Sequence, residues 1–181
     1  VTVTLTATSV LGTNATATAV VTVIDTTDPN TPTLADVTGQ CDATATVPTT
    51  TDNCAGTING TTSDPLTYTA QGTHVITWTF DDGNGNVITA NQNVIVNDTT
   101  APTIVSKPIS VTLASSGTVS ITAQGVLQSG TDNCTSAIVY TLSQSTFGAA
   151  DANNSPVTVQ LTGTDASGNA TIVPAQVTVI D

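Results

Sequence analysis

The chain has 181 residues and a formal net charge of −12 at pH 7, with 13 Asp against one basic side chain, Lys107. One basic side chain cannot neutralise the phosphates of a nucleic acid or an anionic membrane, and neither is an expected partner. Thr, Val, Ala and Ser dominate, Glu, Arg and Met are absent, and the β-branched Thr and Val favour strands over helices. The composition predicts an all-β fold. A cation is the natural counter-charge for its carboxylates, and the open alternative is that scattered Asp residues only keep a Thr-rich surface soluble.

The first expected strand covers residues 1–8 (VTVTLTAT), and the chain begins inside it. Because neither an initiating Met nor a signal peptide precedes it, we expect the sequence to be a piece of a longer protein. No apolar run approaches the roughly 18 residues of a membrane-spanning helix, so membrane insertion is not expected.

Further strands are expected where apolar and polar residues alternate between turn residues. In residues 73–80 (THVITWTF) the alternation places Trp78 and Phe80 on one face with Ile76, which predicts that they lie in the core. Short strands without a helical period predict antiparallel β-sandwiches. The expected strands of this part are 41–47, 66–70, 73–80 and 87–96.

Internal repeats appear when the chain is aligned on its Gly-Asn dipeptides. Residues 82–98 (DGNGNVITANQNVIVND) match residues 165–181 (DASGNATIVPAQVTVID), and residues 9–25 take the same register without the Asp and Asn of the turn. The phrase TDNC also recurs, at 51–54 and 131–134. We therefore predict three parts, namely the C-terminal strands of a preceding repeat (1–24) and two full repeats (25–97 and 98–181).

These motifs resemble a known family. The closing segment (165–181) resembles that of hyalin-type (HYR-like) repeats, and residues 51–86 (TDNCAGTINGTTSDPLTYTAQGTHVITWTFDDGNGN) resemble the form of that repeat found in very large surface proteins of Bacteroidetes. The resemblance implies tandem immunoglobulin-like antiparallel β-sandwiches in an extracellular stalk on the bacterial cell surface. It also implies export by the type IX system and a role in adhesion and gliding motility, with neighbouring repeats as the main partners.

The linkers provide the first candidate site. In an immunoglobulin-like sandwich, the turn between the last two strands lies at the end where the domain begins, so each Gly-Asn turn should approach its own incoming linker. Ca²⁺ binds carboxylate and carbonyl oxygens, and the sequence therefore predicts a Ca²⁺ site at each linker. The expected ligands are Asp25, Asp28, Asp81 and Asp82 at the first linker, and Asp98, Asp165 and Asn169 at the second.

The first of these sites should bind more tightly, because it has more carboxylates. The open alternative is that each Asp or Asn only hydrogen-bonds its own turn, where Gly83, Gly85 and Gly168 supply positive φ. Asp52 is left out of the ligand set, because the expected disulfide would place it beside the bridge.

That disulfide joins Cys41 and Cys54, which a hairpin turning near Pro48 would place opposite each other. The alternative is two free thiols. The position 13 residues before Cys134 is Ile121, so Cys134 is expected to be free or paired outside the sequence. A disulfide fits an extracellular setting.

Asp-Thr-Thr at residues 25–27 and 98–100 matches a short O-glycosylation signal of Bacteroidetes, which predicts sugars on Thr26 and Thr99. Catalysis is not expected, because His74 is the only imidazole and lies within an expected strand. The leading interpretation is a non-catalytic stalk segment of a bacterial surface adhesin. Two alternatives stay open, a module that binds glycans or other surface proteins and an accessory domain of a secreted enzyme; loops without Trp or Tyr favour the stalk.

Overall fold

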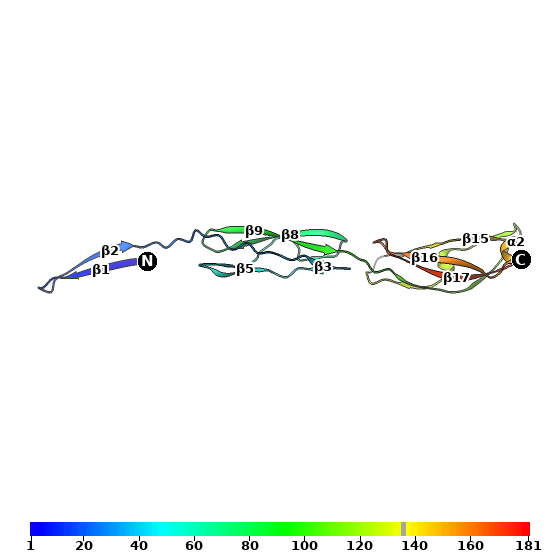
Figure 1. Ribbon diagram of the computed structural model, residues 1–181, viewed down its shortest axis with the longest axis horizontal. Helices are drawn as coiled ribbons and strands as arrows, with labels where there is room; N and C mark the ends of the chain where they lie inside the picture. The colour runs from blue at the N-terminus through cyan, green and yellow to red at the C-terminus, as the bar shows by residue number, and fades with distance from the viewer. Residues whose placement is uncertain (135–136) are drawn as a thin grey trace. The chain divides into compact units, whose positions relative to one another are not determined.

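The computed structural model describes residues 1–134 and 137–181 (Figure 1). The chain forms two compact units. Unit 1 comprises Val1–Ala35, Thr46–Asp64 and Ile76–Gln92, and unit 2 comprises Asp36–Ala45, Pro65–Val75 and Asn93–Asp181. The border between the units differs from the repeat boundary expected at 97/98, and the division into repeats stays a prediction.

Nearly all regular structure is β, which confirms the expected all-β fold class. The strands up to residue 96 are β1 (Thr2–Thr8), β2 (Asn14–Val20), β3 (Val37–Gly39), β4 (Ala43–Thr44), β5 (Thr49–Asp52), β6 (Gly56–Asn59), β7 (Thr67–Tyr68), β8 (Gly72–Asp81) and β9 (Val87–Val96). Strands β3, β9 and β8 form one sheet in that order, with β3 parallel to β9, while β4 pairs with β7 and β5 with β6, both antiparallel.

The remaining elements all belong to unit 2. They are β10 (Thr103–Ser106), β11 (Ile109–Thr112), β12 (Thr118–Ser120), α1 (Ala123–Val126), β13 (Leu127–Thr131), β14 (Val139–Leu142), β15 (Thr146–Gly148), α2 (Ala149–Asn153), β16 (Val157–Thr164) and β17 (Ala170–Ile180). A four-stranded sheet has the order β11-β17-β16-β14, in which β11 is parallel to β17 and the other pairs are antiparallel. Strand β10 pairs with β13, and β12 with β15.

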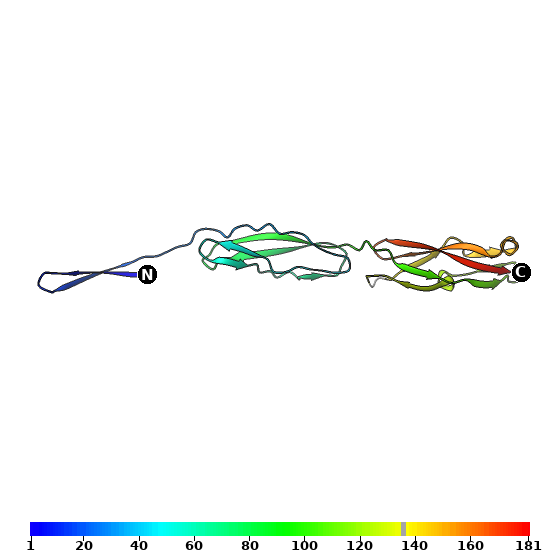
Figure 2. The same cartoon turned by 60° about the horizontal axis from the view of Figure 1, so that its bottom comes forward.

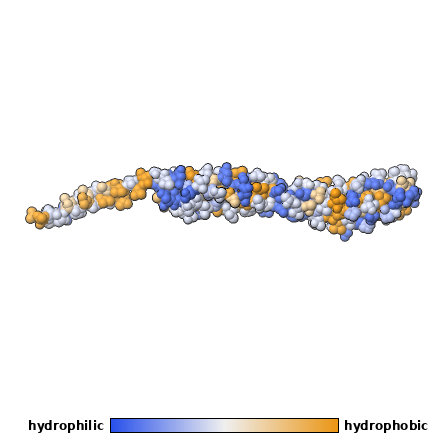
Figure 3. Space-filling model, in the orientation of Figure 1, coloured by the Kyte–Doolittle hydropathy of each residue, from blue (hydrophilic) through white to orange (hydrophobic). Residues whose placement is uncertain are grey.

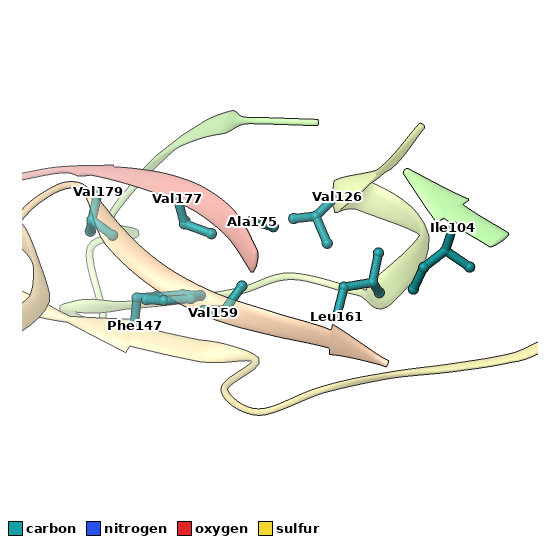
Figure 4. Packing of buried hydrophobic residues seen from close by; sticks show 8 residues of the cluster. All are labelled: Ile104, Val126, Phe147, Val159, Leu161, Ala175, Val177 and Val179. Carbon is teal, nitrogen blue, oxygen red and sulfur yellow. The ribbon is translucent and has the colours of Figure 1, made fainter. Parts of the chain in front are cut away.

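The core of unit 2 follows from the alternation of Val and Thr along β16 and β17. Every second residue of these strands is buried or half-buried, and the buried side chains pack against β10, α1 and β15 (Figure 4). Figure 2 shows β16 and β17, in orange to red, apart from the green strand β10 and the yellow-green strand β13, which pair with each other. The buried cluster consists of Ile104, Val126, Phe147, Val159, Leu161, Ala175, Val177 and Val179.

Strand β8 confirms the expected alternation. Ile76, Trp78 and Phe80 are each at most 1% exposed, while Val75 is 48% exposed. Trp78 Nε1 donates to Gln92 Oε1 (3.0 Å), and Gln92 Nε2 donates to the backbone oxygen of Ala35 (3.0 Å). The single indole N–H is therefore satisfied within the core, as burial requires.

Two expected strands are shorter than the alternation suggested. Pairing between β4 and β7 involves only Ala43–Thr44 and Thr67–Tyr68, extended by one hydrogen bond from Ala45 N to Leu66 O (2.8 Å). The next residue on the β7 side is Pro65, which has no N–H to donate and so ends the ladder.

The hairpin of β1 and β2 is antiparallel in register from Thr2–Val20 to Thr8–Asn14. None of its residues is buried, and its apolar side chains colour this part of the surface in Figure 3. Its turn is held by Ser9, whose Oγ accepts hydrogen bonds from the N–H groups of Leu11 and Thr13, each at 3.2 Å.

Candidate metal-binding sites

The first group of converging carboxylates consists of Asp25, Asp52 and Asp82, here called the first acidic cluster. One ligand oxygen from each lies within 4.8 Å of the others. Asp52 and Asp82 are buried and Asp25 is half-buried. The cluster combines a linker residue, the end of β5 and the turn between β8 and β9, three segments far apart in the sequence.

The turn after β8 positions Asp82. Asp82 Oδ1 accepts from the N–H groups of Asn84 (2.8 Å) and Asn86 (3.1 Å), and Asp82 Oδ2 accepts from Asn86 Nδ2 (2.6 Å). Gly83 has φ +76° and Gly85 φ +108°, values that favour glycine and confirm the expectation for this turn.

The same turn contacts the expected linker at Asp25. Asn86 Nδ2 donates to the backbone oxygen of Asp25, and Asn84 Nδ2 donates to Asp25 Oδ2, both at 3.4 Å. Asp25 Oδ1 also accepts from the N–H of Thr27 (3.1 Å). The expected approach of the Gly-Asn turn to its own linker is therefore confirmed.

Asp52, which the sequence-based ligand set omitted, lies at the end of β5. Its Oδ1 accepts from the N–H groups of Cys54 and Ala55, each at 2.8 Å. Its Oδ2 is buried and accepts no hydrogen bond from the residues that the structure describes. A buried carboxylate oxygen without a donor is unfavourable, and a cation would compensate it.

Hydrogen bonds keep these carboxylates charged. The backbone N–H groups of Ala55 and Cys54 lower the pKa of Asp52 below its usual value. Burial raises the pKa of Asp82, but the Asn86 side chain and the N–H groups of the turn outweigh that effect and leave the pKa lowered. Both groups are thus poised as anions, which is the form that binds a metal ion.

The second acidic cluster consists of Asp98 and Asp132, whose oxygens lie within 4.8 Å of each other and of Cys134 Sγ. Asp98 is only 3% exposed. Asp98 Oδ1 accepts from the N–H of Thr100 (3.1 Å) and Asp132 Oδ2 from the N–H of Cys134 (3.0 Å). The other oxygens, Asp98 Oδ2 and Asp132 Oδ1, are buried and have no donor among the described residues.

Asn169 ties the turn between β16 and β17 to this cluster. Its Nδ2 donates to the backbone oxygen of Asp98 (3.1 Å) and to Asp165 Oδ2 (2.9 Å). Burial raises the pKa of Asp165, but the side chain and N–H of Asn169 outweigh it and leave the pKa lowered. The arrangement repeats that of Asn86 in the first cluster.

The expected disulfide between Cys41 and Cys54 is wrong. Cys41 is bonded to Cys134, with an S–S distance of 2.09 Å and a Cα–Cα distance of 5.0 Å, whereas Cys54 is an exposed free thiol. The hairpin expected near Pro48 does not form, because Ala43–Thr44 pairs with β7 and Thr49–Asp52 pairs with β6. Cys41 therefore precedes β4 and Cys54 lies in the turn after β5, beside strands with different partners.

The other expected ligands lie outside the converging groups. Asp28 is exposed, and the exposed Asp81 accepts from the N–H of Gly83 (2.8 Å) through its Oδ1, a bond within its own turn. Asp165 and Asn169 contact the second cluster through the bonds above, but Asp165 is not among its converging ligand atoms. The missed residues, Asp52 and Asp132, occupy the same place in the repeated TDNC phrase, and that repetition was the available signal.

Thr26 and Thr99, the expected glycosylation sites, are exposed. Their hydroxyls are therefore accessible, and their modification stays a prediction.

These features define a class, an all-β protein in which acidic clusters that could hold a metal ion lie beside the Gly-Asn turns. Among the described residues, no helix has the length and apolar character needed to cross a membrane. No family model and no curated protein matches the chain. Among solved structures, the chain is similar to one described as "PcdhgB3 EC1-4 in 50 mM HEPES", with 12% sequence identity and a TM-score of 0.35. The similarity covers 100% of this chain and 58% of that chain.

Proposed function

We propose that this chain is a non-catalytic structural segment of a bacterial surface adhesin, with Ca²⁺ bound at its acidic clusters. The observation that carries the proposal is the recurrence of one arrangement in two repeats. In each repeat a linker Asp, the Asp of a TDNC phrase and an Asn of the closing turn come together, and at least one buried carboxylate oxygen lacks a donor. Repetition of a site along a chain suits a shared mechanical task better than recognition of one ligand.

The donors favour Ca²⁺ over softer metals. The available atoms are carboxylate and backbone carbonyl oxygens, which hard cations prefer, and the sulfur of Cys134 is already in a disulfide. Ca²⁺ also tolerates irregular coordination by oxygen ligands from separate segments. With a net charge of −12 and one Lys, the chain has almost no cationic side chains that could take this role.

Restriction of the linkers supports a stalk. Pro29 and Pro102 follow the linker Asp residues and are both buried, so their fixed φ and their packing limit the freedom of each linker. The Cys41–Cys134 bond joins residues on either side of the expected repeat boundary at 97/98 within unit 2. Such a bond resists separation of the segments that it joins. The type IX export and gliding role implied by the family resemblance belong to the same proposal.

Calorimetry tests the role of Ca²⁺. The protein is treated with a chelator, dialysed and titrated with CaCl₂, and its thermal unfolding is followed with and without the ion. We expect heat of binding and a higher Tm with Ca²⁺, because an ion that binds only the folded state stabilises it. Mg²⁺ at the same concentration is the matched control, and the absence of both heat and Tm shift with Ca²⁺ would overturn the proposal.

Surface labelling tests the location. An antibody raised against residues 25–181 should stain intact cells of the source organism without permeabilisation. Staining only after permeabilisation would contradict a surface protein.

A further inference from the structure

We propose that Asp132 is a Ca²⁺ ligand together with Asp98, and that the Cys41–Cys134 disulfide holds these two carboxylates in place, so that Ca²⁺ affinity at the second acidic cluster depends on the redox state of the disulfide. The inference rests on the proposed Ca²⁺-binding function and adds to it a ligand and a means of regulation. The first acidic cluster, beside the free Cys54, lacks this dependence.

The need for a cation is greatest at the second cluster. Asp98 is only 3% exposed, and its Oδ2 has no donor among the described residues. Asp132 Oδ1 is in the same situation. The two carboxylates bring ligand oxygens within 4.8 Å of each other, and each has one buried oxygen without a donor among the described residues. Neighbouring carboxylates repel each other, and a divalent cation between them removes that repulsion.

One short segment, Gln40–Cys41, contacts both the segment that carries Asp98 and the segment that carries Asp132. Gln40 Oε1 accepts from Asn133 Nδ2 (2.9 Å) and from the hydroxyl of Thr100. Thr100 is also the residue whose N–H binds Asp98 Oδ1 (3.1 Å). The neighbouring Cys41 carries the covalent bond to Cys134.

The disulfide fixes the loop on which Asp132 lies. Cys134 donates its backbone N–H to Asp132 Oδ2 (3.0 Å), so the bonded cysteine itself orients the carboxylate. Asn133 Nδ2 lies 3.3 Å from Cys134 Sγ and 3.6 Å from Cys41 Sγ. Breaking the S–S bond removes the covalent restraint between Cys41 and residues 132–134, while the hydrogen bond from Asn133 Nδ2 to Gln40 Oε1 can remain. Loss of such a positioning partner typically lowers metal affinity about 10–100-fold.

The site is open to both an ion and a small reductant. A cleft of about 560 Å³ in unit 2 is lined by Asp98, Cys41 and Cys134, together with Asp42, Gln71 and Ser167. A dithiol such as dithiothreitol reduces the bond by two electrons. The S–S bond breaks, each cysteine sulfur takes one proton from the reductant, and the reductant closes to its cyclic disulfide.

Coupling works in both directions. If reduction weakens Ca²⁺ binding by a given factor, Ca²⁺ must oppose reduction by the same factor, because linkage between two equilibria is reciprocal. Saturation with Ca²⁺ should therefore protect the Cys41–Cys134 bond from a fixed concentration of dithiol.

The main test is a CaCl₂ titration of two variants of the full chain by calorimetry, before and after reduction with dithiothreitol. Asp52→Asn weakens the first cluster and isolates the second, whereas Asp132→Asn does the reverse. In D52N, reduction should lower the Ca²⁺ affinity by at least about tenfold. In D132N, where only the first cluster remains, reduction should change the affinity less than twofold.

Three results have different meanings. If no protein binds Ca²⁺ under either condition, the proposed function itself fails. If D52N binds Ca²⁺ equally well before and after reduction, the coupling is wrong while the function stands. If D132N still shows two sites, Asp132 is not a ligand.

A second measurement avoids any loss of folding in the variants. The unmodified protein is exposed to dilute dithiothreitol, and the thiols formed are counted over time at saturating Ca²⁺ and at saturating Mg²⁺. Ca²⁺ should leave a larger fraction of the disulfide intact at equilibrium, and equal fractions would overturn the coupling.

Discussion

Asn169 donates its side-chain amide to the backbone oxygen of Asp98, 3.1 Å away and 71 residues earlier in the chain. Asn86 makes the equivalent bond to Asp25 at 3.4 Å. In both places the bond connects a Gly-Asn turn, between β8 and β9 or between β16 and β17, to an Asp-Thr-Thr segment far earlier in the chain. In the hairpin of β1 and β2, Ser9 and Thr13 take the places of Asp165 and Asn169. Their hydroxyls contact each other at 2.6 Å, so this turn folds without a carboxylate.

Asn169 is expected to stabilise unit 2. Asn169→Ala removes the donor to the Asp98 carbonyl and to Asp165 Oδ2, and leaving buried acceptors without a donor costs about 1–3 kcal/mol. Urea denaturation should show a loss of this size. Asn153→Ala, an exposed change at the end of α2, is the control and should stay within about 0.5 kcal/mol of the unmodified protein. Equal stabilities of the two variants would contradict the role of Asn169.

Acid should destabilise the protein as the pH falls below about 5. The pKa values of Asp52, Asp82 and Asp165 are lowered in the folded state, so the unfolded chain binds protons more readily. Their contribution to the free energy of unfolding is complete above the unfolded pKa of about 3.9, and it is lost as the pH falls through the folded values.

The midpoint of urea denaturation should therefore be measured between pH 8 and pH 2. These carboxylates should leave it unchanged above about pH 5 and lower it at more acidic pH. In D52N the fall should be shallower, because one of the lowered groups is gone. A loss of stability centred near neutral pH would contradict this account.

Substitution of an Asp in the first acidic cluster should lower the Ca²⁺ affinity far more than substitution of Asp28. Asp52→Asn removes a converging charge and should weaken Ca²⁺ binding at this cluster at least about tenfold, since a charged hydrogen-bond or ion contact contributes about 1.5–3 kcal/mol. Asp28→Asn changes an exposed residue outside the cluster and should alter the affinity less than twofold. Calorimetry on both variants decides between the ligand sets, and a larger effect of D28N would restore the original one.

Trp78 is the only Trp of the chain, so fluorescence reports directly on the burial of its indole, and urea denaturation measures its contribution to stability. Trp78→Phe leaves Gln92 Oε1 without its buried donor, so we expect a loss of about 1–3 kcal/mol from that group in addition to the lost packing. Val75→Ala, on the exposed side of β8, serves as the control. In the unmodified protein, Trp78 emission should be blue-shifted and should move to longer wavelength on unfolding, and emission that is already solvent-like would contradict a buried indole.

Thiol labelling should find one reactive cysteine. With the Cys41–Cys134 bond intact, only Cys54 should react, in the native and in the denatured unreduced protein, and all three should react after reduction. Desolvation and the nearby charge of Asp25 raise the pKa of the Cys54 thiol, so its labelling in the native state should be slow at neutral pH and accelerate as the pH rises. Peptide mapping that finds the label on Cys134 would contradict the observed pairing.

The strands with clear alternation were predictable from the sequence. Residues 87–96 were expected as a strand and form β9, and residues 73–80 form most of β8 with Trp78 and Phe80 buried as expected. This works because side chains on a strand alternate between faces, so the buried face can be read from neighbouring residues alone. The approach of each Gly-Asn turn to its linker followed from the resemblance to a sandwich fold, and the bonds from Asn86 and Asn169 confirm it.

Cysteine pairing and ligand choice depended on contacts between distant segments. The sequence alone determined an acidic, all-β chain with repeated turns, because composition and alternation are local properties. Only the tertiary structure decided that Cys41 meets Cys134, 93 residues away, and that Asp52 points into the first cluster while Asp28 does not. The physical reason is that a bond or an ion site requires atoms to lie a few ångströms apart, and which loops come that close is set by how the sheets pack.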